Sequence, residues 1–261
     1  METALLFVPG DRPDRFAKAA GSGADAVIVD LEDAVATERK AAARQAVRAA
    51  FDGGLRAYVR INSVADPDGV ADLAALAGSD TLGVMLPKTA NAREVEVVVR
   101  SMRPGTAVIA LIESLIGMRN IETIAGAPGV SALAFGAYDF SSELGAQPLP
   151  EVLAPWRSRL VFEARAAKVA SFDAPFAGLH DDAAMAVEAR RAADFGFDGK
   201  LAVHPRQVPI IQNAFRPTAD EIARAQAIVG GNSGGATAVD GEMIDGPLLN
   251  AARRILARAS A

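Results

Sequence analysis

The sequence of 261 residues contains no cysteine, only two histidines and one tryptophan. The absence of cysteine excludes disulfides, thiol catalysis and zinc–thiolate sites. Two histidines are too few for a metal site built from three histidine ligands. A metal bound by this chain would therefore depend mainly on carboxylates.

The chain also lacks an excess of positive charge and any long hydrophobic run. Its net charge is −5 and its pI is near 5.2, which argues against nucleic acid as a partner. No apolar run reaches the length that crosses a membrane, so we expect no membrane partner. The first residues, METALLFVPGDR, show no basic region followed by a long apolar core. We therefore expect a cytoplasmic protein.

Short apolar runs are abundant, and each is followed by a helical pattern. Such runs are typical of strands buried on both faces of a parallel sheet. Eight strand–helix units of this spacing predict an α/β fold, a (β/α)8 TIM barrel over residues 1–215. The alternative is a doubly wound open sheet, but no G-x-G-x-x-G follows the first strand. The predicted strands are Leu5 to Pro9, Ala26 to Leu31, Ala57 to Ile61, Leu82 to Leu86, Val108 to Ile112, Ala132 to Phe135, Ala170 to Ala174 and Lys200 to Val203.

Polar side chains gather at the ends of these strands. The carboxyl ends of barrel strands meet on one face, and this face carries the active sites of TIM-barrel enzymes. We therefore expect one site formed from Arg12, Glu32, Asp33, Arg60, Lys88, Glu113, Asp139, Asp173 and His204.

Glu113 and Asp139 follow two neighbouring strands. Two carboxylates without nearby cysteine or histidine suggest a site for a hard cation, most plausibly Mg²⁺. The alternative is structural: Glu113 would cap the helix that starts near Leu115, and Asp139 would simply end a strand.

Four cations are candidates for substrate contacts. Arg60 lies in an apolar run, where its planar guanidinium suits a substrate carboxylate or an internal salt bridge to the acids that end the second strand, Asp30, Glu32 and Asp33. Arg12, Arg15 and Lys18 lie near the start of the first helix. They suit either a grip on phosphate or carboxylate groups or a solvated surface.

The last segment, residues 216–261, predicts a C-terminal helical extension or lid. Thr218 to Val229 reads as a helix with a capping box, and GGNSGG follows. Gly246-Pro247 starts a final amphipathic helix, and Asp245 lies just before it in a predicted hinge. The extension suits a lid or an arm that reaches a neighbouring subunit; the alternative is a helix packed on the chain's own surface.

Eight motifs in this order resemble the citrate lyase β-subunit-like group of the HpcH/HpaI aldolase family, over nearly the whole chain. They are FVPGDRPDRFAKA (7–19), VIVDLEDAV (27–35), VRIN (59–62), MLPK (85–88), ALIES (110–114), FGAYD (135–139), GFDGKLAVHPRQ (196–207) and DGEMIDGP (240–247).

This resemblance implies a Mg²⁺-dependent barrel enzyme that makes or breaks a C–C bond between a 2-oxo acid and an acetyl-type unit. By resemblance, Glu113 and Asp139 match the metal ligands, with Glu113 also facing the substrate, and Arg60 matches an arginine that contacts the substrate. The tail aspartate Asp245 matches an acid/base group, often supplied by an adjacent subunit of a homotrimer. The other matches are Arg12, Arg15 and Lys18 near coenzyme A, Val203 and His204 along the thioester pocket, and Glu32, Asp33 and Lys88 as supporting groups.

One departure concerns Tyr138, where the family often has a charged or acidic residue before the second metal ligand. The expected substrates are 3-hydroxyacyl-CoA thioesters such as malyl- or citramalyl-CoA. The alternatives are a citrate lyase β subunit acting on citryl-acyl carrier protein, an aldolase for free acids, and a non-enzymatic protein that binds metal and oxo acid.

Overall fold

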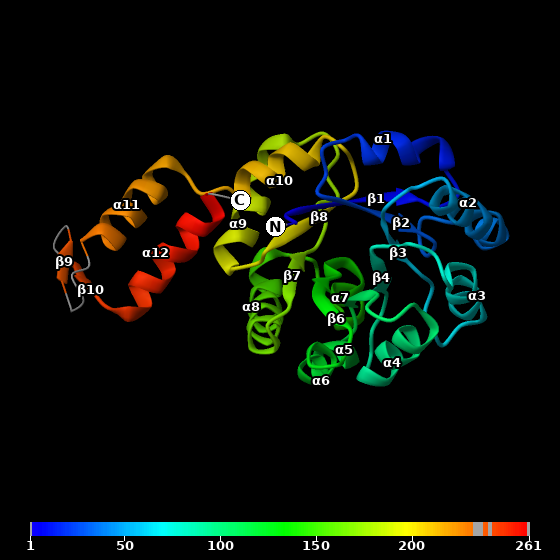
Figure 1. Cartoon of the computed structure of the whole chain (residues 1–261). Coiled ribbons are helices and arrows are strands. Elements are labelled where there is room, and N and C mark those ends of the chain that lie inside the picture. Colours follow the sequence, from blue (N-terminus) through cyan, green and yellow to red (C-terminus); the bar gives the residue numbers. More distant parts are fainter. Residues whose placement is uncertain (1, 232–236, 240–241, 260–261) are drawn as a thin grey trace.

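The eight predicted strands form one closed parallel barrel in sequence order, and the first strand pairs with the last. We describe a computed structural model, which covers residues 2–231, 237–239 and 242–259. The (β/α)8 prediction is confirmed, and the open sheet is excluded because a closed barrel has no edge strand (Figure 1). The strands are β1 (Ala4–Pro9), β2 (Ala26–Asp30), β3 (Tyr58–Arg60), β4 (Gly83–Leu86), β5 (Ala107–Ile112), β6 (Val130–Phe135), β7 (Ala170–Asp173) and β8 (Gly199–Ala202).

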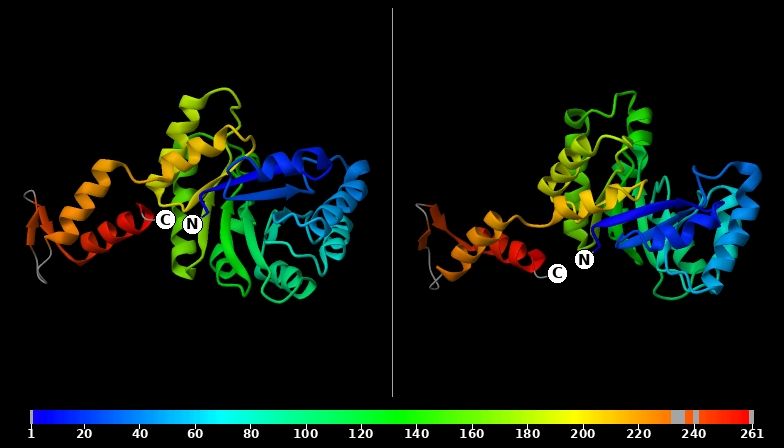
Figure 2. Two further views of the ribbon diagram at one scale, coloured as in Figure 1. Left: turned by 45° about the horizontal axis from the view of Figure 1, so that its top comes forward. Right: turned by 90° about the horizontal axis from the view of Figure 1, so that it is seen from above.

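Helices connect the strands and cover the outside of the barrel (Figures 1 and 2). Three of them, α3, α7 and α10, were not located from the sequence. Asp66 and Pro67 are the start signal of α3, because proline suits the first turn of a helix. The helices are η1 (Pro13–Arg15), α1 (Phe16–Ala20), η2 (Thr37–Arg39), α2 (Lys40–Asp52), α3 (Pro67–Leu76), α4 (Ala92–Ser101), α5 (Leu115–Arg119), α6 (Ile121–Ala125), α7 (Ala137–Leu144), α8 (Pro150–Ala167), α9 (Asp182–Phe195) and α10 (Gln207–Phe215).

Side chains of each strand alternate between two buried layers, as the pleat requires. One layer fills the barrel interior and includes Ile28, Leu111 and Phe172. The other packs between strands and helices and includes Val29 and Ile112. Both faces of most strands are therefore apolar, which explains why the sequence shows continuous apolar runs rather than an alternating pattern. Strand β7 is an exception, because Ser171 and Asp173 are out of phase with the interior residue Phe172.

The C-terminal extension leaves the barrel as an arm (Figures 1 and 2). Helix α11 (Ala219–Gly230) runs outward, the antiparallel pair β9 (Thr237–Val239) and β10 (Glu242–Ile244) lies at the far end, and α12 (Gly246–Ala259) runs back. The predicted hinge thus contains a short hairpin, while Asp240 and most of GGNSGG lie outside the described residues. A separate small core holds the arm together, with Ala225, Ile228, Ile244 and Ala252 buried in it.

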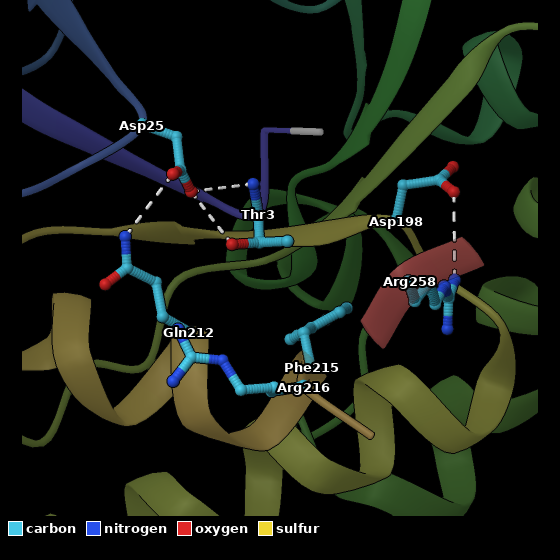
Figure 3. A pocket seen from close by; sticks show the side chains of 7 residues that line it. All are labelled: Thr3, Asp25, Asp198, Gln212, Phe215, Arg216 and Arg258. Carbon is cyan, nitrogen blue, oxygen red and sulfur yellow. Dashed lines mark hydrogen bonds and ion pairs between the residues drawn. The ribbon is translucent and has the colours of Figure 1, made fainter. Parts of the chain in front are cut away.

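Ion pairs from both helices of the arm help to attach it to the barrel. Arg190 of α9 forms an ion pair with Glu221 of α11 at 2.7 Å. Arg258 near the end of α12 lies 3.9 Å from the carboxylate of Asp198. Figure 3 shows these two side chains joined by a dashed line. Asp198 precedes β8, so the arm is anchored at the amino ends of the strands, opposite the face where the strands end. No helix in the described part of the chain has the length and apolar composition that crossing a bilayer demands.

Candidate active site

Glu113 follows β5 directly, and its side chain is only 3% exposed. The helix cap that the sequence left as an alternative belongs instead to the next residue. Ser114 Oγ accepts a hydrogen bond from the backbone N–H of Gly117 at 3.0 Å and caps α5. Glu113 therefore lies over the barrel interior, in phase with Leu111.

A left-handed backbone conformation at Lys88 supports Glu113. Lys88 has a φ of 47°, which is uncommon for a residue other than glycine and carries strain. This conformation accompanies a 2.8 Å hydrogen bond from the Lys88 N–H to Oε1 of Glu113. The loop after β4 thus holds one carboxylate oxygen and leaves the other for a further partner.

Gly136 provides the space that the second oxygen of Glu113 occupies. A Cβ at this position would lie 2.5 Å from Oε2 and 2.4 Å from Cβ of Glu113. Any larger residue would have to displace the glutamate. The FGAYD motif therefore contributes two features to the site: the aspartate Asp139, and a glycine whose lack of a side chain leaves room for Glu113.

Asp139 lies in the first turn of α7, on the loop side of the neighbouring strand β6. Glu113, Asp139 and Arg60 line one cavity of about 140 Å³. Its base is apolar, with Phe7, Leu111, Phe135 and Leu201 among the lining residues. The structure thus brings together the three residues that the sequence analysis placed at the centre of the site.

Arg60 is held by the acids of the neighbouring strand. Its Nε and Nη2 donate to the two carboxylate oxygens of Asp30 at 2.7 and 2.6 Å. Its guanidinium also lies 5.0 Å from the centre of the Phe7 ring. The internal salt bridge is therefore present, and it fixes the guanidinium in a wall of the cavity.

Glu32 connects Arg60 with Lys88. Its Oε1 accepts a hydrogen bond from Lys88 Nζ at 2.7 Å, and its Oε2 lies 3.0 Å from Arg60 Nη1. That second contact is an ion pair without hydrogen-bond alignment, so this buried oxygen lacks a hydrogen-bond partner. Asp33 is more exposed and lies 3.8 Å from Arg60. These groups form a charged network beside the cavity.

Negative charge dominates this region, because five carboxylates face two cations: the acids Asp30, Glu32, Asp33, Glu113 and Asp139 against Arg60 and Lys88. Burial, followed by the charge of Glu32, raises the pKa of Glu113 to about 8. Burial also raises the pKa of Glu32, although Arg60 and Lys88 oppose the shift.

These observations fit a hard divalent cation. A buried carboxylate with an open oxygen and a raised pKa is the group that a nearby positive charge would stabilise. Within the described residues, no group of three or more His, Cys, Asp or Glu side chains is arranged to hold a metal. The pair Glu113 and Asp139 would therefore leave coordination positions for water and a substrate, as is usual for Mg²⁺.

Asp173 does not belong to this site, and its prediction was wrong. Its side chain is 1% exposed and pairs with Lys200 at 2.7 Å and with Arg157 of α8 at 2.9 Å. The preceding residue, Phe172, faces the barrel interior, so Asp173 points outward against the helices.

Five predicted substrate contacts lie away from the cavity lining. Arg12 pairs with Asp14 on the surface, and Arg15 and Lys18 are exposed in the turn and helix after β1. Val203 is exposed and His204 is half-buried after β8, the strand that pairs with β1. These five residues thus follow two paired strands, and none of them lines the cavity.

Asp245 precedes α12 at the far end of the arm (Figure 1). It is exposed, and its carboxylate accepts a hydrogen bond from the N–H of Leu248 at 3.2 Å. The structure does not bring it to the cavity of its own barrel.

Fold and site together define a (β/α)8 barrel protein with a carboxylate pocket suited to a divalent cation at the carboxyl ends of its strands. The chain belongs to the HpcH/HpaI aldolase/citrate lyase family, whose sequence profile matches residues 3–205.

Individual relatives cover almost the whole chain. A citrate lyase subunit beta-like protein of Mycobacterium tuberculosis is 38% identical over 97% of this chain and 94% of its own length. A (3S)-malyl-CoA thioesterase of Cereibacter sphaeroides is 32% identical over 98% and 94% of the two chains. The crystal structure of CitE from M. tuberculosis in complex with magnesium, acetoacetate and coenzyme A covers 100% of this chain and 98% of its own, with 36% identity and a TM-score of 0.91.

Proposed function

We propose that this chain is a Mg²⁺-dependent lyase that splits a 3-hydroxyacyl-CoA, such as malyl- or citramalyl-CoA, into a 2-oxo acid and acetyl-CoA, or joins them. The observation that carries the proposal is the cavity that Glu113 and Asp139 share with Arg60. The CitE structure with magnesium, acetoacetate and coenzyme A supports the same combination of ligands.

Glu113 and Asp139 would hold the cation, and their negative charges match it. Bound Mg²⁺ would supply Lewis-acid polarisation of the substrate oxygen and a fixed orientation for the carboxylate beside it. Asp30 holds Arg60 in a rigid position. The positive charge of Arg60 would then face the substrate oxygen that carries negative charge while the C–C bond breaks.

In the cleavage direction the 3-hydroxyl group loses its proton to water and becomes the carbonyl group of the 2-oxo acid, an aldehyde in glyoxylate and a ketone in pyruvate. The C–C bond breaks, and its electron pair forms the enolate of the acetyl thioester. We assign the proton that this enolate gains to Asp245, acting as a general acid. In the reverse direction Asp245 would remove that proton.

Asp245 would act in the barrel of another subunit. The arm is anchored at the amino ends of the strands and extends away from its own barrel (Figure 2). This direction supports an assembly of several copies, which we propose to be a homotrimer. The exposed cations Arg12, Arg15 and Lys18, together with Val203 and His204, would contact the coenzyme A part of the substrate.

A specific observation favours a second function, hydrolysis of the thioester, since one relative is named a (3S)-malyl-CoA thioesterase. Another relative, from Escherichia coli, is named citrate lyase subunit beta, which keeps citryl-acyl carrier protein as a candidate substrate.

The test is to mix the purified full chain with Mg²⁺ and a panel of CoA thioesters and to measure two products. A lyase releases glyoxylate, pyruvate or oxaloacetate and leaves the thioester bond intact. A thioesterase releases free coenzyme A, which a thiol reagent reports without background because the chain has no cysteine. If neither product forms from any thioester, the CoA lyase proposal is refuted, and citryl-acyl carrier protein becomes the next substrate to test.

A further inference from the structure

Two cavities meet at the first turn of α7. The catalytic cavity has a volume of about 140 Å³. A larger cavity of about 500 Å³ lies between α8, α9 and the loop after β7, and we call it the side pocket. Ala137, Tyr138 and Pro175 line both cavities, so the two share a wall.

Tyr138 is the largest residue of this shared wall. It is 47% exposed, and its hydroxyl oxygen accepts a hydrogen bond from the backbone N–H of Ala177 at 3.2 Å. This bond joins the first turn of α7 to the loop after β7. The ring is thus held at the boundary between the catalytic cavity and the side pocket.

The lining of the side pocket suits hydrocarbon. Pro148, Leu153, Phe176 and Val187 are among its walls. Its two charged residues are already paired with each other, because Arg157 lies 3.5 Å from Glu188, and Arg157 also binds Asp173. A second substrate carboxylate would find no free cation in this lining, whereas an alkyl chain would gain from burial.

We propose that Tyr138 sets the size limit for the 2-oxo acid by closing the catalytic cavity against the side pocket. The inference rests on the proposed function, in which the oxo acid binds at the cation between Glu113 and Asp139. Tyr138 lines the same cavity as Glu113 and Asp139, and in this proposal the side chain of the oxo acid is the part of the substrate that Tyr138 limits. The native enzyme accordingly takes oxo acids with a short side chain, and a smaller residue at position 138 admits longer ones.

The experiment measures Mg²⁺-dependent binding of glyoxylate, pyruvate, 2-oxobutanoate and 4-methyl-2-oxopentanoate to the full chain by calorimetry. The native chain is expected to bind the two smallest acids more tightly than 4-methyl-2-oxopentanoate. In Tyr138→Ala the preference shifts toward the larger acids by about fourfold for each added methylene, the ratio that corresponds to ~0.8 kcal/mol of burial. The ratio of affinities for 4-methyl-2-oxopentanoate and pyruvate should therefore rise tenfold or more.

Three further variants distinguish removal of the Tyr138 ring between the two cavities from a general loss of folding or ligand binding. Tyr138→Phe keeps the ring and should retain the native preference. Tyr138→Leu removes part of the ring and should show part of the gain, so the size limit is testable even if Tyr138→Ala fails to fold. The double variant Tyr138→Ala/Ala184→Phe places a ring in the side pocket from α9 and should reverse the gain for the larger acids while pyruvate still binds.

Unchanged affinity ratios in both Tyr138→Ala and Tyr138→Leu, with pyruvate bound in a Mg²⁺-dependent way, would overturn the size limit alone. So would a native chain that binds 4-methyl-2-oxopentanoate as tightly as pyruvate. A native chain that binds no oxo acid in the presence of Mg²⁺ would overturn the proposed function itself, and the size limit with it.

Discussion

The barrel and the arm are stabilised in different ways. The barrel buries large apolar layers on both faces of its strands and keeps the charged groups Asp173 and Lys200 paired between its strands and helices. The arm has a small core of its own and is attached to the barrel through partly exposed ion pairs. The barrel therefore holds Glu113 and Arg60 rigidly, whereas Asp245 sits on a part with fewer constraints. The groups proposed to bind the metal and substrate thus lie in the rigid barrel, whereas the proposed general acid lies in the arm.

The largest expected effect comes from Glu113→Gln in the barrel. Loss of the carboxylate should abolish Mg²⁺-dependent oxo-acid binding and reduce turnover by about a thousandfold or more, since a bound cation contributes several kcal/mol of charge stabilisation. Calorimetry and product release measure the two effects.

The same variant has a stability signature with a defined pH dependence. The pKa of Glu113 is raised to about 8 from an ordinary value near 4.5, so ionisation destabilises the folded, metal-free protein. The penalty is absent below the ordinary value, grows as the pH rises, and is complete above about 8. Glu113→Gln should therefore raise the melting temperature of the metal-free protein most at high pH. If the melting temperatures of Glu113→Gln and the native protein differed more at pH 5 than at pH 8.5, ionisation of Glu113 would not be the cause of the difference.

Asp245→Asn in the arm should lower turnover by on the order of a hundredfold to ten-thousandfold, the usual contribution of a general acid. Asparagine is as good a helix cap as aspartate, so the stability of α12 should not change. Calorimetry should show unchanged Mg²⁺ and oxo-acid binding. Turnover equal to the native value would refute the assigned role.

Mixing this variant with Glu113→Gln sharpens the comparison between barrel and arm. If the arm serves another subunit, mixed assemblies regain part of the activity because intact arms meet intact barrels. If the arm served its own barrel, every chain in the mixture would stay inactive.

Two glycine variants, one in the barrel and one in the arm, should differ less strongly in their effects on Mg²⁺ binding. Gly136→Ala places a Cβ against Glu113 and should weaken Mg²⁺ binding by about tenfold or more, since the carboxylate must move. Gly230→Ala in the arm meets no atom within 4 Å and should leave binding unchanged. Equal Mg²⁺ affinities for the two variants would mean that the close packing at Gly136 has no role in the site.

The smallest effect is expected at the ion pair between Arg190 and Glu221. The hydrogen bond from Arg190 lowers the pKa of Glu221 to about 2. The contribution of this pair is present above the ordinary glutamate value and is lost as the pH falls toward 2. Because both side chains are partly exposed, solvent screening limits its size. Hydrogen exchange in α11 should accelerate in Glu221→Gln near neutral pH, whereas the matched surface variant Glu96→Gln should leave α11 unaffected.

Much of the barrel was predictable because each strand is a continuous apolar run that ends in polar residues. The same continuous apolar runs did not allow us to predict which side chains point into the barrel and which point toward the helices. With both faces apolar, the sequence does not show which residues point inward, so Asp173 and Glu113 looked equivalent at their strand ends. The structure separates them, since Glu113 is in phase with the interior residue Leu111 and Asp173 is out of phase with Phe172.

The features that escaped prediction depend on contacts between distant segments. The salt bridge of Arg60 was one of two alternatives, but its bidentate geometry with Asp30 requires the register of β2 against β3. The need for glycine at position 136 appears only when β5 and β6 lie side by side. The hairpin β9–β10 is short and lies beside a glycine-rich segment, so it offered little periodic signal.

The anchoring of the arm opposite the site also has a consequence for handling the protein. If one chain folds its own barrel but completes another chain's site, the folding unit is smaller than the active unit. Specific activity would then fall on dilution as assemblies dissociate, while the fold of each chain stays intact. An assay at nanomolar enzyme would report the equilibrium between assembled and separate chains as much as the chemistry.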